Sequence, residues 1–295
     1  MDILFDRRLL AVHKLRAARR PNSGSDFLIH RACSELADRL AIVDRRFEHA
    51  ISLISAHDLV AQTLIQSGKV DRITTIEADS KLLYGQSGIV EPEEVVPLAE
   101  QSADLAVSLF ALHEINDVPG YLAQIRRALR ADGLLLAAFS GAGTLAELRE
   151  CMIAAETELS GGAAARIYPF MDVRDAGALL QRAGFALPVT DVESVVARYD
   201  SALDVMHDLR AMGAGNALIG GRRPLTRGIL DRIEEIYADR FSDPDGRLRA
   251  TFNTIWISGW VPHASQQKPL KPGSATTRLD EALQQIKKSQ AKKPE

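Results

Sequence analysis

Short apolar runs alternate with amphipathic stretches along the first half of the chain. Four segments have the length and composition of buried strands: residues 49–54, 72–76, 103–110 and 134–139. Helical spacing of apolar positions predicts helices over residues 58–66 and 117–129. Because strands alternate with helices, we expect a parallel sheet and an α/β fold.

The second half of the chain is richer in helical patterns. Helices are expected over residues 144–157, 172–183, 201–212 and 225–241, and strands over residues 185–189 and 250–261. Trp256 and Trp260 fall on one face of the last strand, where core packing is the simplest interpretation. Two helices separate this strand from its expected neighbour. We therefore predict a helical insertion at about residues 200–245, before the final strand of the sheet.

The two ends of the chain differ from the middle. The start is basic, and Leu9, Leu10, Val12 and Leu15 share one broad helical face. We favour an arm folded onto its own domain or onto a partner over a membrane-surface helix or an organelle transit peptide. The predicted organisation is a basic arm with a first helix at residues 1–45, a main domain at 46–263, and a polar, mobile tail at 264–295 with a short helix at 279–286.

The amino-acid composition of the chain excludes several classes of protein. The chain has 295 residues, of which 46% are hydrophobic, enough for one large domain with insertions. A net charge of -3 argues against a nucleic-acid partner, which calls for a basic field. No apolar run approaches the roughly 20 residues that cross a bilayer. The two cysteines, Cys33 and Cys151, lack metal-ligand spacing, and we interpret them as reduced, packed thiols.

Several polar residues follow the predicted strands. His113 and Glu114 come after the strand at residues 103–110, so we expect them to line a substrate mouth at the carboxyl edge of the sheet. His57 lies beside Asp58 in the sequence, and such a pair can act as a general base. The favoured interpretation is that Asp58 caps the next helix. No second ligand accompanies His113 at helical spacing, so we predict no metal site.

A glycine turn follows the strand at residues 134–139. Gly141-Ala142-Gly143 lacks the lysine and the spacing of a phosphate-binding loop, so a flexible turn is favoured, with Thr144 as the cap of the next helix.

Longer motifs carry a family resemblance. The segment ADLAVSLFALHEINDVPGYLAQIRRALRADGLLLAAF, residues 103–139, resembles the fourth strand, helix and fifth strand of class I S-adenosylmethionine (SAM) dependent methyltransferases, including the biotin-pathway carrier-protein methyltransferase. FDR at 5–7, TLAELR at 144–149, AETE at 155–158, RAGF at 182–185, DLRAMGAGN at 208–216 and KPGSAT at 271–276 are more specific. In this order they resemble the family of the mitochondrial complex I assembly factor that is an arginine hydroxylase, with its alphaproteobacterial relatives.

The resemblance implies a Rossmann-like fold, namely a seven-stranded class I SAM-dependent methyltransferase sheet with a helical insertion before the last strand. It also implies a SAM-type pocket and a protein partner, for which a peripheral-arm subunit of complex I is the candidate. The implied location is the cytoplasm of a bacterium, with peripheral contact at the inner face of the membrane, or the mitochondrial matrix of a eukaryote. Two activities stay open, SAM-dependent methyl transfer and arginine hydroxylation.

The cofactor loop departs from the family pattern DxGxGxG. Residues 52–58 read SLISAHD, so Ser52 replaces the acid, while Ile54 and Ala56 stand at glycine positions. A β-branched residue in a left-handed conformation is strained by about 1–3 kcal/mol, and we expect the side chain of Ile54 to fill cofactor space. A lost charge-assisted contact at Ser52 is worth roughly 1.5–3 kcal/mol.

The remaining cofactor contacts are acidic. Glu77 or Asp79, after the strand at residues 72–76, is placed to accept the ribose hydroxyls of SAM, although both also suit a solvated turn. A third acid is displaced, because Pro92 falls at its position and only Glu91 or Glu93 is near. The sequence therefore predicts that SAM binding is weak or absent, lowered about 100-fold to 10,000-fold at roughly 1.4 kcal/mol per decade.

Overall fold

A computed structural model describes residues 3–19, 24–220 and 223–267. The chain divides into a unit at residues 1–262 and a second unit at residues 263–295. The expected helix at residues 279–286 and the KPGSAT motif lie outside the described residues. All the helices and strands named below belong to the first unit.

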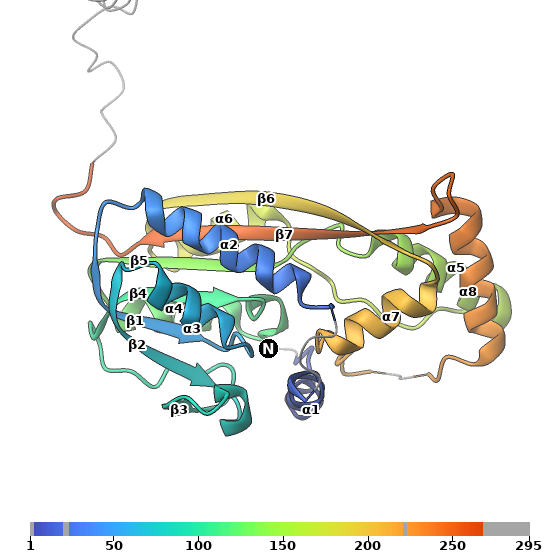
Figure 1. Ribbon diagram of the computed structural model, residues 1–295, viewed down its shortest axis with the longest axis horizontal. Coiled ribbons are helices and arrows are strands. Elements are labelled where there is room, and N and C mark those ends of the chain that lie inside the picture. The colour runs from blue at the N-terminus through green and yellow to red at the C-terminus, as the bar shows by residue number, and fades with distance from the viewer. Residues whose placement is uncertain (1–2, 20–23, 221–222, 268–295) are drawn as a thin grey trace, which may run out of the picture. The chain divides into compact units, whose positions relative to one another are not determined.

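A seven-stranded sheet forms the centre of this unit (Figure 1). The strands are β1 (Phe47–Leu53), β2 (Val70–Glu77), β3 (Gly88–Val90), β4 (Ala103–Leu109), β5 (Leu129–Ser140), β6 (Ala186–Tyr199) and β7 (Leu248–Trp260), and their order across the sheet is β3-β2-β1-β4-β5-β7-β6. The first five strands pair in parallel, as predicted, and β7 is antiparallel to both neighbours, β5 and β6. The predicted class I methyltransferase fold is confirmed.

The helices occur where the apolar spacing placed them. They are α1 (Arg7–Ala18), α2 (Phe27–Ile42), α3 (Leu59–Gln66), α4 (Val118–Ala128), α5 (Ala146–Ser160), α6 (Val173–Arg182), α7 (Ala202–Ala211) and α8 (Arg227–Phe241), with short 3-10 turns η1 (Ser80–Leu83) and η2 (Leu112–Glu114). Helices α7 and α8 lie between β6 and β7, where the insertion was expected.

Two strands, β5 and β6, are at least six residues longer than predicted. β6 continues to Tyr199, and the prediction stopped short because polar and apolar residues are mixed along residues 190–199 and no continuous apolar run marks them. β5 begins at Leu129 and contains the expected turn as an irregularity, since its register against β4 shifts between Ala103 and Leu105 and Asp132 has a φ of 61°.

Alternating residues of the strands supply two core layers. On β4, Leu105, Val107 and Leu109 pack with residues of α2 and α3, and Ala106 packs on the opposite face with residues of α4 and α6. Trp256 is fully buried in the first of these layers, as expected of the last strand. A third core joins α5, α7 and α8 to the far ends of β6 and β7, which extend past β5 in Figure 1.

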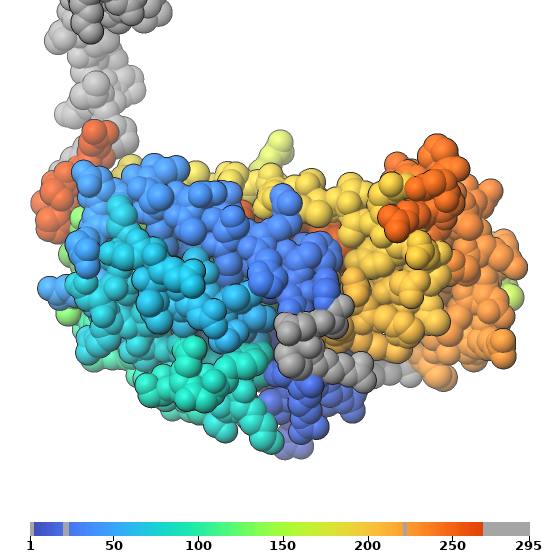
Figure 2. Space-filling view, viewed as in Figure 1, coloured from blue at the N-terminus to red at the C-terminus, as the bar shows by residue number. Residues whose placement is uncertain are grey.

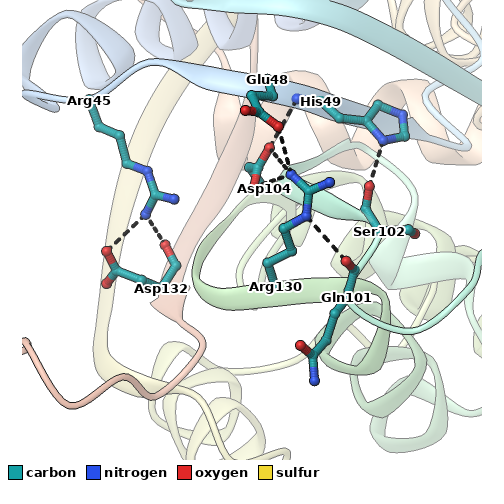
Figure 3. A network of polar contacts seen from close by, with 8 residues as sticks. All are labelled: Arg45, Glu48, His49, Gln101, Ser102, Asp104, Arg130 and Asp132. Atoms are coloured by element: carbon teal, nitrogen blue, oxygen red, sulfur yellow. Dashed lines mark hydrogen bonds and ion pairs between the residues drawn. The ribbon is translucent and has the colours of Figure 1, made fainter.

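A polar network ties the amino ends of β1, β4 and β5 (Figure 3). Arg130 donates to both carboxylate oxygens of Asp104 at 3.1 Å, and it lies 3.0 Å from a carboxylate oxygen of Glu48. Asp104 accepts the backbone N–H of His49, whose ring contacts the carbonyl of Ser102 at 2.8 Å. The network fixes the three strands at the edge opposite their carboxyl ends.

Candidate functional site at the carboxyl edge of the sheet

A cavity of about 580 Å³ opens at the carboxyl edge of the parallel strands. This size lies within the range of small-ligand sites. Its wall includes the loop after β1 at residues 55–59, Phe110 and His113 after β4, Ser140 at the end of β5, and residues of α1, α2, α5 and α7. The space-filling view shows α1 and α2 at the surface of one face of the unit (Figure 2). Open α/β sheets place ligands at this edge.

The loop after β1 has an unusual backbone. Ile54 has a φ of 49° and Ala56 a φ of 50°, so both residues adopt the left-handed conformation in which glycine is favoured. The side chain of Ile54 packs against the core layer on the α4 and α6 side and does not line the cavity. Ile54 is therefore not part of the wall of this cavity, and its effect on cofactor space stays a prediction.

Ala56 is held by two side chains from β2 and the segment after it. Its N–H donates to Oε1 of Glu77 at 2.9 Å, and its carbonyl accepts the hydroxyl of Tyr84 at 2.9 Å. Glu77 is only 1% exposed, and burial raises its pKa from 4.5 to about 8. Its Oε2 atom is buried without a hydrogen-bond partner among the described residues.

The other two predicted cofactor positions lie apart from the cavity. Ser52 is buried within β1, paired with β2 and β4 on either side. Asp79 caps η1, because its side chain accepts the backbone N–H of Lys81 at 2.8 Å. Of the five predicted cofactor residues, only Ala56 lines the cavity.

Asp58 does not take the capping role expected of it, and the general-base hypothesis for His57 stays a prediction. Asp58 precedes α3 but makes no capping hydrogen bond, and it accepts the side chain of Gln62 at 2.7 Å instead. His57 contacts the start of the helix, because its Nδ1 atom lies 3.2 Å from the backbone nitrogen of Leu59. Burial lowers the pKa of His57, so the ring is neutral at pH 7.

His113 and Glu114 reach the site from η2, but only His113 lines the cavity. Burial lowers the pKa of His113 to about 4, and its Nδ1 atom has no hydrogen-bond partner among the described residues. Glu114 forms an ion pair of 2.9 Å with Lys14 of α1, and both side chains are largely buried. A neutral imidazole is therefore the polar group that this strand end offers to a ligand.

An aromatic wall stands beside His113. The ring of Tyr168 lies 6.4 Å and that of Phe170 5.8 Å from the imidazole, measured between ring centroids. Tyr168 also packs edge-on against Phe5 at 4.9 Å and donates its hydroxyl to the carbonyl of Gly215 at 2.8 Å. Tyr168 therefore contacts both the FDR motif, through Phe5, and the DLRAMGAGN motif, through Gly215.

Sequence reasoning missed Tyr84, Tyr168 and Phe170 because they follow no strand-end or spacing pattern. Thr144 was also misassigned. It exchanges hydrogen bonds of 3.1 Å with the backbone of Asn253 on β7 and does not cap α5. No group of three or more His, Cys, Asp or Glu side chains is placed to hold a metal ion in the part of the chain that the structure describes. No described helix is long and apolar enough to span a membrane.

Comparisons with known proteins agree with this geometry. Residues 57–137 match the model of a family described as a methyltransferase domain. The chain is 34% identical over 280 residues to the arginine-hydroxylase NDUFAF5, mitochondrial, of Danio rerio, covering 92% of this chain and 87% of that protein. The human protein of the same name is 33% identical over 285 residues, with 94% and 83% covered.

Two further similarities are more distant. Malonyl-[acyl-carrier protein] O-methyltransferase of Laribacter hongkongensis is 41% identical over 181 residues, which covers 61% of this chain and 58% of that protein. The crystal structure of the YcgJ protein from Bacillus subtilis superposes with a TM-score of 0.52 at 16% identity, covering 79% of this chain and 99% of that one. The second similarity concerns the fold alone.

Proposed function

Because the chain belongs to the family of the mitochondrial arginine-hydroxylase NDUFAF5, we propose that it acts on a protein partner that enters the cavity. In this proposal the cofactor loop is degenerate and SAM binding is weak or absent. The chain is thus a methyltransferase-like protein related to the complex I assembly factor. A peripheral-arm subunit of complex I is the proposed partner, in keeping with the sequence motifs.

The hydrogen bonds made by the backbone of Ala56 are the main observation that supports this proposal. In class I methyltransferases, glycines let the bare backbone of this loop approach the cofactor. Here the N–H of Ala56 is taken by Glu77 and its carbonyl by Tyr84. The N–H of Ala56 is not free for a ligand unless its hydrogen bond to Glu77 breaks, which costs about 0.5–1.5 kcal/mol, and its carbonyl keeps one lone pair beyond the bond from Tyr84.

The acidic contacts fit SAM only in part. Ser52 supplies no carboxylate for the cofactor's ammonium group and is buried in β1. Oε1 of Glu77 accepts the N–H of Ala56, and the unpartnered Oε2, which carries the proton below the raised pKa of about 8, can donate to the oxygen of a ribose hydroxyl. This single contact favours the rival proposal, an active SAM-dependent methyltransferase with an unusual loop.

The cavity itself supports a protein ligand. His113, Tyr168 and Phe170 offer flat apolar faces and one unpartnered ring nitrogen, which suit a side chain with a hydrogen-bond donor and an apolar stem. The activity named for the relatives makes arginine hydroxylation the second rival, which would leave one added oxygen atom on a partner arginine.

Calorimetric titration with SAM and with its demethylated product tests the cofactor half of the proposal. We expect no measurable heat from the wild type. The double variant Ala56→Gly with Tyr84→Phe restores a glycine and frees the carbonyl of residue 56, so we expect it to gain a ligand-dependent thermal shift. Adding Glu77→Gln to that variant is the matched control and should reduce the gain if the ribose contact is made. Stoichiometric heat release by the wild type would contradict the proposal.

Mass spectrometry of the partner protein distinguishes arginine hydroxylation from methyl transfer and from binding without modification. Peripheral-arm subunits are purified from cells with and without the gene and their arginine peptides are compared. A gene-dependent gain of one oxygen on an arginine would establish hydroxylation, and a gain of one methyl group would establish methyl transfer. Impaired complex assembly with unmodified peptides would support binding alone.

A further inference from the structure

Strand β6 forms one margin of the sheet. It is the last strand in the order β3-β2-β1-β4-β5-β7-β6, so among the described residues only β7 pairs with it (Figure 1). From Val189 to Tyr199 this pairing runs over eleven residues without a register shift. The backbone N–H and C=O groups of this stretch that point away from β7 bond to no described residue, so they can pair with another strand.

The outer edge of β6 lacks the features by which proteins protect such strands. Residues 189–199 contain no proline and no lysine. Their three charged side chains already form ion pairs within the chain: Asp191 with Arg39, Glu193 with Arg31, and Arg198 with Asp243 and Asp245. The edge therefore presents no unpaired charge that would repel a second strand.

Exposed valines lie on one face of this strand. Val192 is 46% exposed and Val196 53%, and Ser194 lies between them on the same face. Exposed aliphatic side chains beside unpaired backbone groups make an edge strand prone to pair with another chain.

The sequence of this edge is self-complementary. When two copies of a strand pair in an antiparallel manner about a two-fold axis, the residue at the axis faces its own copy, and residues at equal distances on either side face each other. Ser194 is the midpoint of residues 189–199, so an axis at Ser194 pairs the whole regular stretch. Val192 of each copy then faces Val196 of the other copy, which gives two Val–Val pairs across the axis.

Neighbouring registers fit less well. An axis at Glu193 would place two glutamates directly opposite each other, and like charges in that position are destabilising. An axis at Val195 would place Val192 opposite Arg198 and leave the exposed valines unpaired with each other. With the axis at Ser194, no two like charges are directly opposite.

We propose that two copies of this chain associate through antiparallel pairing of their β6 strands around Ser194, which joins the two sheets into one. A second copy is favoured over an unrelated strand because a single register pairs the whole regular edge and matches its exposed valines with each other. Eleven edge residues a side are fewer than the roughly 20–30 of a standard interface, so we expect a dimer that dissociates on dilution.

This pairing leaves the cavity of each copy accessible. No described residue of β6 lines the cavity. Strand β6 runs parallel to β5, because both are antiparallel to β7. The two-fold axis reverses the strand direction between the copies, so the two cavities would open in opposite directions. The inference therefore stands independently of the proposed function.

Sedimentation velocity of the full-length protein, from about 1 μM to about 100 μM, measures the equilibrium between monomer and dimer. We expect wild type to approach twice the mass of one chain as its concentration rises. Val192→Lys with Val196→Lys places lysines opposite each other at two positions, and should raise the dissociation constant about 10-fold or more. Val192→Lys with Val196→Glu is the matched control. The same register then places each lysine opposite a glutamate, so the dissociation constant should stay within a few-fold of wild type.

Disulfide formation tests the register directly. Ser194→Cys places a thiol directly opposite its own copy, at a separation that suits a disulfide. Val192→Cys places its two thiols four residues apart along the paired strands, about 13 Å, which is too far. The native Cys33 and Cys151 are buried. Under mild oxidation we expect a covalent dimer from the first variant and little from the second.

Three outcomes would overturn the inference. One is wild-type protein that keeps the mass of a single chain at about 100 μM. Another is equal self-association of the variant with two lysines and its control with lysine and glutamate, when thermal melting shows that both are folded. The third is faster cross-linking through position 192 than through position 194, which would assign the contact to another register or another surface.

Discussion

Glu77 makes a pH-dependent contribution to the free energy of unfolding, and the substitution Glu77→Gln measures it. Burial raises its pKa from 4.5 to about 8 in the folded protein, so the folded state holds a proton that the unfolded state releases above pH 4.5. The stabilisation linked to this proton is complete below pH 4.5 and is lost as pH rises towards 8.

The magnitude follows from the size of the shift. One pKa unit corresponds to about 1.4 kcal/mol, so the difference between 4.5 and about 8 amounts to about 5 kcal/mol at most. Between pH 5 and pH 8 the free energy of unfolding should fall by about 3 kcal/mol through this group alone.

Glu77→Gln removes the titration while keeping an oxygen that accepts the N–H of Ala56. Relative to wild type, we expect the variant to gain about 3 kcal/mol in free energy of unfolding between pH 5 and pH 8. Urea unfolding at four pH values measures the difference, and Glu100→Gln, at an exposed residue, is the control. A difference between Glu77→Gln and wild type that does not change with pH would refute the reasoning.

Two further predictions concern the packing around the cavity. Arg166 pairs with Glu156, which is 1% exposed, so Arg166→Ala should lower the free energy of unfolding by about 3–5 kcal/mol by leaving a buried charge unpaired, and adding Glu156→Gln should recover part of the loss. Chemical denaturation of the single and double variants checks this, and equal stability of the two would contradict it. Phe5→Ala removes the edge-on contact with Tyr168 and should cost about 3–5 kcal/mol, while Ile42→Ala, at an 84% exposed side chain, should cost under about 0.5 kcal/mol. Faster hydrogen exchange in α1 of the Phe5 variant is expected, and unchanged exchange would show that this ring does not anchor the arm.

Much of the fold was predictable because buried parallel strands leave a plain signature. The run at residues 134–139 is apolar throughout and lies in β5, which is covered on both faces. β6 was underestimated because this edge strand mixes polar and apolar residues and lacks that signature. Local hydrogen bonds were the weakest predictions, since Asp58 and Thr144 have the chemistry of helix caps but find other partners in the folded chain.

The cavity could be predicted only in outline. A strand-end rule located His113, and a motif comparison located the loop around Ala56. Tyr84 and Tyr168 reach the same region from segments whose position depends on the folded insertion and on the turn after β2. No periodic pattern in the sequence predicts that Tyr84 and Tyr168 lie near the same cavity. The left-handed backbone of Ile54 was expected from its glycine position, but the packing of its side chain against the core on the α4 and α6 side was not.

The place of β7 has a consequence for biogenesis. This strand is inserted between β5 and β6, although it is the last of the seven to leave the ribosome. Until residue 260 has been synthesised, β5 presents an open edge and β6 has no neighbour to pair with. A nascent chain stopped before Leu248 would therefore expose this edge to chaperones and to aggregation, and the sheet can close only after β7 has been synthesised.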